Sequence, residues 1–365
     1  MVQSAYIHIP FCKSKCGYCS FVSYTGSDSS LRKKYVEELI LEIKAEYKSE
    51  DLKTLYFGGG TPSLTEPEGI KKIIQNISLL PDAEVTLEIN PETVDKSRLT
   101  QYKKAGINRL SIGVQSFDDD ILKAIGRIHT ADKAIKTITD AKDAGFKNIS
   151  LDFIYGLPSQ SLQSFTNDLK TAVSLDIEHI SLYGLKIEEG CRFFQNPPEN
   201  IADDDLQADM YLAAIELLEQ AGFKHYEISN FSKEGFESQH NLNYWNAKEY
   251  YGFGAAAHGY TNNTRYSNYC DLKNYFEKSS KKQYLHSQTK QEKLEEAIFL
   301  GFRKAKGINT NELNRNFDID FEKEYKSILE KFTKTKHLLK TPSGYCLSNE
   351  GFLISNIILS DFICC

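Results

Sequence analysis

The chain has 365 residues, and its 44 Lys and Arg against 50 Asp and Glu give a formal net charge of −6. A chain of this length can bury a large core without disulfides. The mild acidity argues against a protein that depends on non-specific electrostatic attraction to nucleic acid. No apolar run approaches the ~18 residues of a membrane helix. Met1 to Ser4 do not begin a secretory signal, so we expect a cytoplasmic, reducing location.

The first half of the chain alternates strand patterns with helix patterns. Strands are predicted at 5–9, 54–57, 85–89, 109–114, 148–155 and 179–185. Helices are predicted at 30–47, 67–79, 95–105, 121–125, 131–144 and 161–175. Such alternation indicates a parallel sheet with right-handed crossovers. We therefore predict an α/β fold whose residues 1–185 form a partial (β/α)6 TIM-like barrel, with polar residues at the strand ends facing the site.

After residue 186 the alternation stops. A helix at 203–221 and a strand at 226–228 precede a stretch at 229–285 that is rich in Asn, Tyr and Gly, and we expect that stretch to be irregular and compact. Helical patterns return from 291 and end in a turn at 342–344, an order that resembles a winged helix. The expected parts are an extension at 186–288 and a mostly helical, winged-helix-like domain at 289–365.

Three of the eight cysteines, Cys12, Cys16 and Cys19, form a C-x3-C-x2-C loop directly after the first strand. Three thiolates this close can hold three corners of a [4Fe–4S] cube and leave one iron open for reactivity. Zinc prefers four ligands, and no second C-x2-C is present. Zinc and three unpaired thiols remain the alternatives. Cys364 and Cys365 close the chain, where a frayed tail is expected.

The cysteine loop, opening a β/α barrel, resembles the radical S-adenosylmethionine (SAM) superfamily. In that superfamily the open iron binds SAM, whose reductive cleavage gives a 5′-deoxyadenosyl radical. Further ordered motifs resemble the oxygen-independent coproporphyrinogen III oxidase group over nearly the whole chain. They are YIHIPFC from Tyr6, FGGGTP from Phe57, LEINP from Leu87, RLSIGVQSF from Arg109 and DFIYGLP from Asp152.

The resemblance implies a set of SAM-binding residues at the strand ends. Glycines let a backbone approach a ligand, carboxylates and amides suit ammonium and hydroxyl groups, and a guanidinium clamps a carboxylate. The implied set is Tyr6, Tyr18, Gly59, Gly60, Thr61, Glu88, Gln115, Arg127 and Asp152. Taken singly, each could be a structural residue, and it is their joint match that favours a cofactor site. His8, near the loop, is a weaker candidate for supporting it.

Two features depart from the oxidase pattern. That pattern carries a further cysteine where this chain has Phe21, and a long segment before its cysteine loop, whereas eleven residues precede Cys12 here. Both departures match a sister family, the heme chaperones HemW. His240, Tyr244 and Trp245 supply its H-N-x-x-Y-W signature, which by resemblance serves heme binding. Imidazole is an ordinary heme ligand, although a lone histidine is more often structural. His258 is a weaker alternative ligand.

The resemblance thus implies a heme chaperone holding a [4Fe–4S] cluster, SAM and heme. Its implied partners are heme or porphyrin and a respiratory heme-acceptor protein at the membrane, with no nucleic acid. Two readings differ from it. The chain could be an oxidase that converts coproporphyrinogen III propionates to vinyl groups, or the C-terminal part could bind nucleic acid, which the charge makes least favourable. Whether SAM is cleaved, and whether the protein is a monomer or a homodimer, stays open.

Overall fold

A nine-stranded sheet forms the centre of the computed structural model, which describes residues 2–363. The terminal Cys364 and Cys365 lie outside the described residues. Six strands pair in parallel in chain order. They are β1 (Ser4–Ile9), β4 (Leu52–Gly59), β5 (Leu79–Ile89), β6 (Arg109–Gln115), β7 (Ile149–Tyr155) and β8 (His179–Gly184). The predicted parallel (β/α)6 partial barrel is confirmed.

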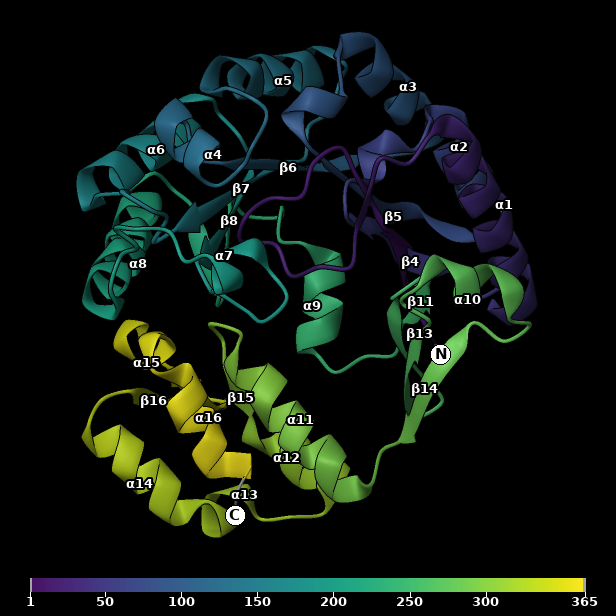
Figure 1. Ribbon diagram of the computed structural model, residues 1–365. Helices are drawn as coiled ribbons and strands as arrows, with labels where there is room; N and C mark the ends of the chain where they lie inside the picture. The colour runs from purple at the N-terminus through teal and green to yellow at the C-terminus, as the bar shows by residue number, and fades with distance from the viewer. Residues whose placement is uncertain (1, 364–365) are drawn as a thin grey trace.

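Helices surround this sheet as an outer ring (Figure 1). They are α1 (Ser29–Glu46), α2 (Pro67–Ile74), α3 (Lys96–Ala105), α4 (Asp119–Ala124), α5 (Ala131–Asp143), α6 (Leu162–Ser174) and α8 (Asp204–Gln220). Capping fixes several ends: the Asp28 side chain accepts the Leu31 N–H at the start of α1, and Gly106 closes α3 with a φ of 113°. Their apolar faces meet fully buried strand residues such as Leu55 and Leu110.

The sheet continues beyond the predicted barrel at both edges. β11 (Tyr251–Phe253) adds in parallel to β1, while β10 (Asn230–Ser232) pairs antiparallel with β8 and with β9 (Lys224–Glu227). The expected irregular structure over 229–285 is therefore wrong. This stretch also holds α9 (Gln239–Trp245), β12 (His258–Thr261), β13 (Thr264–Asn268), α10 (Leu272–Glu277) and β14 (Lys282–Ser287). These elements are short and depend on distant pairing, which local patterns do not reveal.

Short elements lie around the strand ends. β2 (Phe11–Cys12) pairs with β3 (Tyr24–Thr25) on the two sides of the cysteine loop. The 3₁₀ turns η1 (Pro62–Leu64) and η2 (Pro91–Thr93) follow β4 and β5, and α7 (Arg192–Gln195) follows β8. The predicted helix at 67–79 ends earlier, at Ile74, and Leu79 already belongs to β5.

The C-terminal part has the predicted order of helices followed by a hairpin. It comprises α11 (Lys290–Phe302), β15 (Ile308–Asn309), α12 (Thr310–Phe317), α13 (Phe321–Glu324), α14 (Lys326–Lys334), β16 (Leu338–Thr341), β17 (Gly344–Leu347), α15 (Asn349–Leu353) and α16 (Ser355–Ile363). Backbone hydrogen bonds between Ile228 and Arg303 and between Ala305 and Tyr226 join it to the β9 region.

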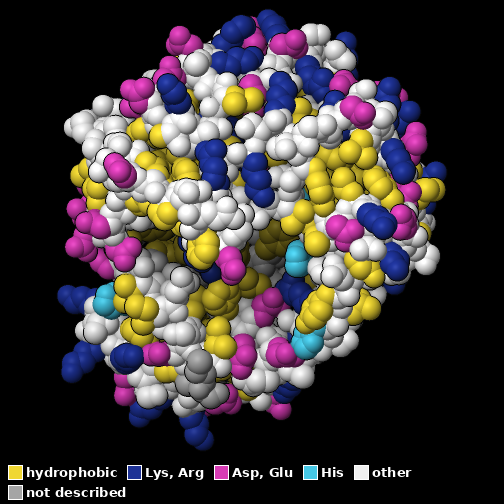
Figure 2. Space-filling view, in the orientation of Figure 1, with side chains coloured by type: hydrophobic (Ala, Val, Ile, Leu, Met, Phe, Trp, Pro, Cys, Tyr) yellow, Lys and Arg dark blue, Asp and Glu magenta, His cyan; other side chains and the backbone are white. Residues whose placement is uncertain are grey.

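The face seen in Figure 1 is hollowed between the barrel and the C-terminal helices, where Figure 1 draws α9, and hydrophobic side chains line the hollow (Figure 2). Over residues 2–363, no helix is long and apolar enough to cross a membrane.

Candidate functional site

A cavity of about 480 Å³ lies where the barrel strands end, beside the cysteine loop. Its walls bring together thiols, carboxylates, amides and a guanidinium with aromatic and aliphatic side chains. The polar lining includes Cys12, Cys16, Cys19, Thr61, Glu88, Asn90, Ser111, Gln115, Arg127 and Asp152. The apolar lining includes Tyr18, Phe21, Tyr56, Ile154, Tyr183 and Leu185. A cavity with this mixture suits a small molecule that has both charged and flat parts.

The three loop cysteines are free thiols that are neither fully buried nor fully exposed. Partial burial raises the pKa of Cys12 and of Cys19, so in the absence of a positive ligand both favour the protonated thiol. A metal would reverse this by displacing the protons, because the thiolate is the binding form. Among residues 2–363, no group of His, Cys, Asp or Glu side chains is arranged to hold a single metal ion. This finding is compatible with a cluster site, because the cysteine sulfurs that hold a four-iron cube lie farther apart than the ligands of a single ion.

A directed chain of hydrogen bonds connects Arg127 to the Cys12 sulfur. The Arg127 Nη2 donates to Asn90 Oδ1 at 2.7 Å, and Asn90 Nδ2 donates to Thr61 Oγ1 at 3.0 Å. The Thr61 hydroxyl then donates to Cys12 Sγ at 3.5 Å. Arg127 Nη1 also lies 3.7 Å from Cys16 Sγ. Both sulfurs therefore receive donors that stabilise the thiolate form.

Glycines allow the close approach of the second strand end to the loop. A Cβ on Gly60 would lie 2.7 Å from the Phe11 carbonyl oxygen and 3.0 Å from Cys12 Sγ. Gly59 has a φ of 117°, and a Cβ there would lie 2.8 Å from the His8 ring. Only glycine fits both positions without displacement.

Glu88 ends β5 with both carboxylate oxygens hydrogen-bonded. Oε1 accepts the Tyr56 hydroxyl at 2.8 Å, and Oε2 accepts the Gly59 N–H at 3.2 Å. Burial, with a smaller contribution from the nearby Asp152, raises the pKa of Glu88 to about 7, and both hydrogen bonds oppose this shift. Glu88 therefore changes charge near neutral pH, and a cationic neighbour would stabilise its ionised form.

Gln115 is the last residue of β6, and Asp152 lies in the middle of β7. Both Asp152 carboxylate oxygens lie 2.9 Å from the Ser111 hydroxyl, and burial raises the Asp152 pKa to about 6. Gln115 has a φ of 68° at an irregularity in the pairing of β6 with β7. Such backbone strain in a non-glycine residue gathers at functional sites.

Of the residues predicted to contact SAM, all but Tyr6 line this cavity. Tyr6 lies behind it: its ring stacks on Tyr56 with centroids 6.1 Å apart, and its hydroxyl lies 3.0 Å from His8 Nδ1. Sequence reasoning missed Asn90, Tyr56, Ser111 and Tyr183. Asn90 lies in the LEINP motif and Ser111 lies in the RLSIGVQSF motif. Tyr56 shares the inward face of β4 with Thr54 and Gly58.

Comparison with known proteins identifies the family. The Radical SAM superfamily model matches residues 6–172, and the HemN C-terminal domain model matches residues 288–354. The chain is 35% identical to "Heme chaperone HemW" of Bacillus subtilis (strain 168), over 99% of both chains. The chain belongs to the HemW family of radical SAM proteins. It is also 40% identical to HemW of Escherichia coli (strain K12), over 70% of this chain and 69% of that one.

The fold has a solved counterpart in coproporphyrinogen III oxidase (HemN) from Escherichia coli. The TM-score is 0.87 over 99% of this chain and 90% of that chain, at 20% sequence identity. At that identity the likeness concerns the fold. It confirms that a HemW-family chain folds as a radical SAM barrel followed by a HemN-type C-terminal domain.

Membership of the radical SAM superfamily implies a [4Fe–4S] cluster and SAM, and the residues fit both groups. Three thiols face one cavity, and Gly60, because it lacks a side chain, lets its backbone pack against Phe11 and Cys12 and line the same cavity. We assign Cys12, Cys16 and Cys19 to the cluster and the lining polar residues to SAM as proposals. When bound, these groups supply radical chemistry.

The signature residues His240, Tyr244 and Trp245 lie on α9 and do not line the cavity. His240 is 1% exposed, its Nδ1 lies 2.8 Å from Thr54 Oγ1, and its Nε2 lies 2.8 Å from the Tyr244 hydroxyl. Burial lowers the His240 pKa to about 3, so the ring is neutral. Both nitrogens are engaged, so an axial role for His240, which stays a prediction, requires breaking one of these bonds.

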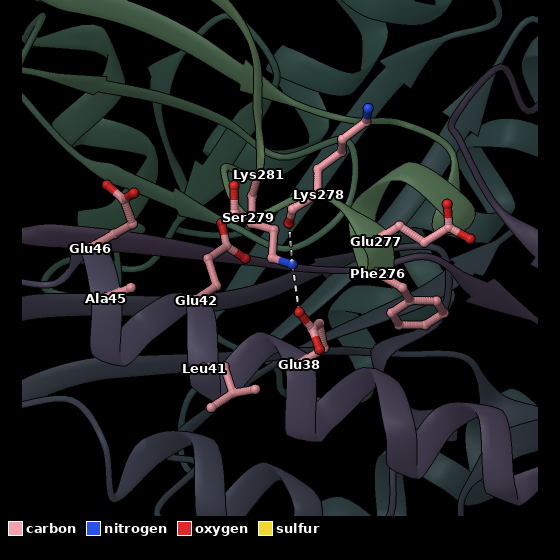
Figure 3. Close-up of a pocket in the computed structure, with 10 residues that line it drawn as sticks. All are labelled: Glu38, Leu41, Glu42, Ala45, Glu46, Phe276, Glu277, Lys278, Ser279 and Lys281. Atoms are coloured by element: carbon pink, nitrogen blue, oxygen red, sulfur yellow. Dashed lines mark hydrogen bonds and ion pairs between the residues drawn. The ribbon is translucent and has the colours of Figure 1, made fainter.

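A second cavity, of about 380 Å³, lies between α1 and α10 (Figure 3). Lys281 spans it and donates to Glu38 and to the Lys278 carbonyl (Figure 3). The carboxylate of Glu42, 4% exposed, accepts from the Tyr275 hydroxyl, Asn268 Nδ2 and the Gly254 N–H. These groups satisfy one another and attach residues 254–281 to α1, so this cavity has a structural role.

Proposed function

We propose that this protein is a heme chaperone that holds a [4Fe–4S] cluster and SAM, binds heme and delivers it to an acceptor protein. The observation that carries the proposal is full-length similarity to proteins named heme chaperone HemW, at 35% identity over 99% of both chains for the Bacillus subtilis relative. The cavity supports the cofactor part, because its thiols, carboxylates and guanidinium match what each group needs.

Phe21 favours the chaperone over the oxidase. It occupies the position where the oxidase pattern carries a further cysteine, and it lines the cavity as a residue that is 67% exposed. An exposed phenyl ring beside the cluster loop offers flat apolar surface rather than another sulfur ligand or acid group. Oxidative decarboxylation of coproporphyrinogen III is the second candidate function, because the cavity proposed to bind SAM would serve that reaction as well.

Heme contact is proposed at α9, where hydrophobic side chains line the hollow in the surface (Figure 2). Tyr244 and Trp245 supply aromatic surface for a macrocycle, and partial exposure leaves them accessible. Two histidines compete as iron ligands: the buried His240 and the exposed His258 on β12.

Anaerobic titration of the cluster-loaded protein with heme tests the proposal. We expect a Soret band that saturates, followed by transfer of the heme to apomyoglobin as a generic acceptor. The single variants His240→Ala and His258→Ala identify the ligand, because only loss of the true axial ligand shifts the Soret band. Absence of saturable heme binding by the loaded wild type would refute the chaperone function.

A further inference from the structure

His240 faces the barrel interior at a place where it contacts the wall of the SAM cavity. Its ring stacks on Tyr56, with centroids 5.0 Å apart and planes inclined by 23°. Tyr56 lines the cavity and donates its hydroxyl to Glu88 Oε1 at 2.8 Å. One aromatic side chain therefore separates the signature helix α9 from a carboxylate of the cavity.

The His240 ring is fixed in this position from both nitrogens. The Thr54 hydroxyl donates to Ser4 Oγ, so it accepts from His240 Nδ1–H, and Nε2 is left to accept the Tyr244 hydroxyl. Thr54 and Tyr56 lie two residues apart on the same face of β4, and the histidine covers both. Rotation of the ring would break one buried and one partly buried hydrogen bond, so the stacking surface offered to Tyr56 is rigid.

Helix α9 itself is attached at both ends. The Gln239 and His240 N–H groups each donate to the Glu84 carboxylate at 3.1 Å, and Ser238 caps the helix. At the other end the Arg303 guanidinium lies over the Trp245 ring, 5.5 Å from its centroid. Displacement of α9 would therefore change the contact of His240 with Tyr56 and the contact of Trp245 with Arg303 in the C-terminal part.

We propose that His240 is a positioning residue for the SAM cavity: by stacking on Tyr56 it fixes the tyrosine hydroxyl on Glu88, and so couples helix α9 to ligand binding at that carboxylate. The inference rests on the proposed binding of SAM in this cavity. It assigns His240 a function that requires no contact with heme. Coupling of this kind acts in both directions, so SAM must change the environment of α9 by the same contacts.

The ring and the hydrogen bonds of His240 are separable by mutation. His240→Phe keeps a flat ring on Tyr56 and loses both hydrogen bonds, whereas His240→Gln keeps an amide near Tyr244 and loses the ring. Tyr56→Phe keeps the stack and removes the hydroxyl from Glu88. His225→Gln is the matched control, because His225 is a half-buried histidine that stacks on Phe231, 4.6 Å between centroids, and is not part of the cavity lining.

The test is SAM affinity of the cluster-loaded protein, measured by equilibrium dialysis without reductant. We expect His240→Gln and Tyr56→Phe each to weaken binding about three- to tenfold, and the double variant to be no weaker than either, because coupled neighbours are not additive. His240→Phe keeps the ring but loses both bonds that fix it, so its loss should be smaller than that of His240→Gln, and His225→Gln should remain near wild type. An unchanged His240→Gln, or additive losses in the double variant, would overturn the coupling.

The only tryptophan of the chain, Trp245, gives an independent readout on α9. SAM added to the loaded wild type should change its emission, and Tyr56→Phe, which keeps the ring, should abolish the change even if His240→Gln does not fold. No SAM-dependent change in a wild type that binds SAM would overturn this inference alone. A loaded wild type that binds no SAM would overturn the proposed cofactor site, and this inference with it.

Discussion

The Arg127 guanidinium lies 3.7 Å from the sulfur of Cys16 and 2.7 Å from the Asn90 amide oxygen. A permanent positive charge is thus held between the cysteine loop and the strand ends, in a cavity whose other charged groups include Glu88 and Asp152. Its Nη2 already donates to Asn90 and to the Gly113 carbonyl, whereas its buried Nε–H has no partner and can donate to a ligand carboxylate. The cavity therefore presents one site for a carboxylate and a separate one for a cation.

Arg127→Lys tests whether the guanidinium group itself is needed. Lysine keeps the positive charge but lacks the planar set of N–H donors, so we expect SAM to bind about tenfold more weakly, the usual value of a charge-assisted hydrogen bond. Iron content should stay at the wild-type level, because the three cysteines are intact and lysine keeps a positive charge beside Cys16. Equilibrium dialysis of the loaded proteins measures the change, and equal affinities would remove the guanidinium from SAM recognition.

The cysteine assignment predicts a sharp difference among serine variants. Cys12→Ser should lower the iron content from about four per chain to near background, because a cube at a three-cysteine site loses a corner. Cys270→Ser is the control, since Cys270 is an exposed free cysteine that is not part of the cavity lining. Iron and sulfide analysis after anaerobic reconstitution decides, and equal loss in both variants would count against the loop as the cluster site.

SAM affinity should depend on pH through Glu88. Burial raises the pKa of this carboxyl to about 7, so it is mostly neutral at pH 6 and mostly ionised at pH 8. A cation or hydroxyl of SAM binds the ionised form better, so affinity should rise between pH 6 and pH 8 and the pKa should fall in the complex. Glu88→Gln should flatten the profile. A wild-type affinity that is constant over this interval would show that Glu88 does not face the ligand.

Glu42 is predicted to be a stability residue. Glu42→Ala leaves the Tyr275 hydroxyl, Asn268 Nδ2 and the Gly254 N–H without their buried acceptor, which should lower the free energy of unfolding by about 3 kcal/mol. Glu38→Ala, on the same helix, removes a more exposed ion pair with Lys281 and should lower it by less than about 1 kcal/mol. Urea denaturation compares the variants. Equal midpoints would contradict a structural role for the Glu42 cluster.

Much of the barrel and its site follows from local sequence. The strand Arg109–Gln115 is buried along its whole length, and its Leu110, Ile112 and Val114 give it a strand-like pattern. Parallel topology then places the carboxyl ends of such strands together. The spacing of the cysteines indicates their chemistry directly. For these reasons the residues predicted to bind the cluster and SAM, apart from Tyr6, line a single cavity.

What the sequence could not provide is the partner of a side chain that lies far along the chain. His240 has the chemistry of a metal ligand, yet its ring is enclosed by Thr54, 186 residues earlier, and by Tyr56. The short strands between 230 and 287 likewise form only because β1, β8 or one another offer edges to pair with. These contacts depend on tertiary packing, which no local periodicity encodes.

The most direct test of the account is turnover of coproporphyrinogen III by the cluster-loaded protein with SAM and reductant, followed by chromatography and mass analysis of the porphyrins. A heme chaperone with Phe21 beside its cluster loop should leave the propionates intact, while the same preparation binds heme and transfers it. Formation of protoporphyrinogen together with stoichiometric 5′-deoxyadenosine would contradict the account and establish the oxidase.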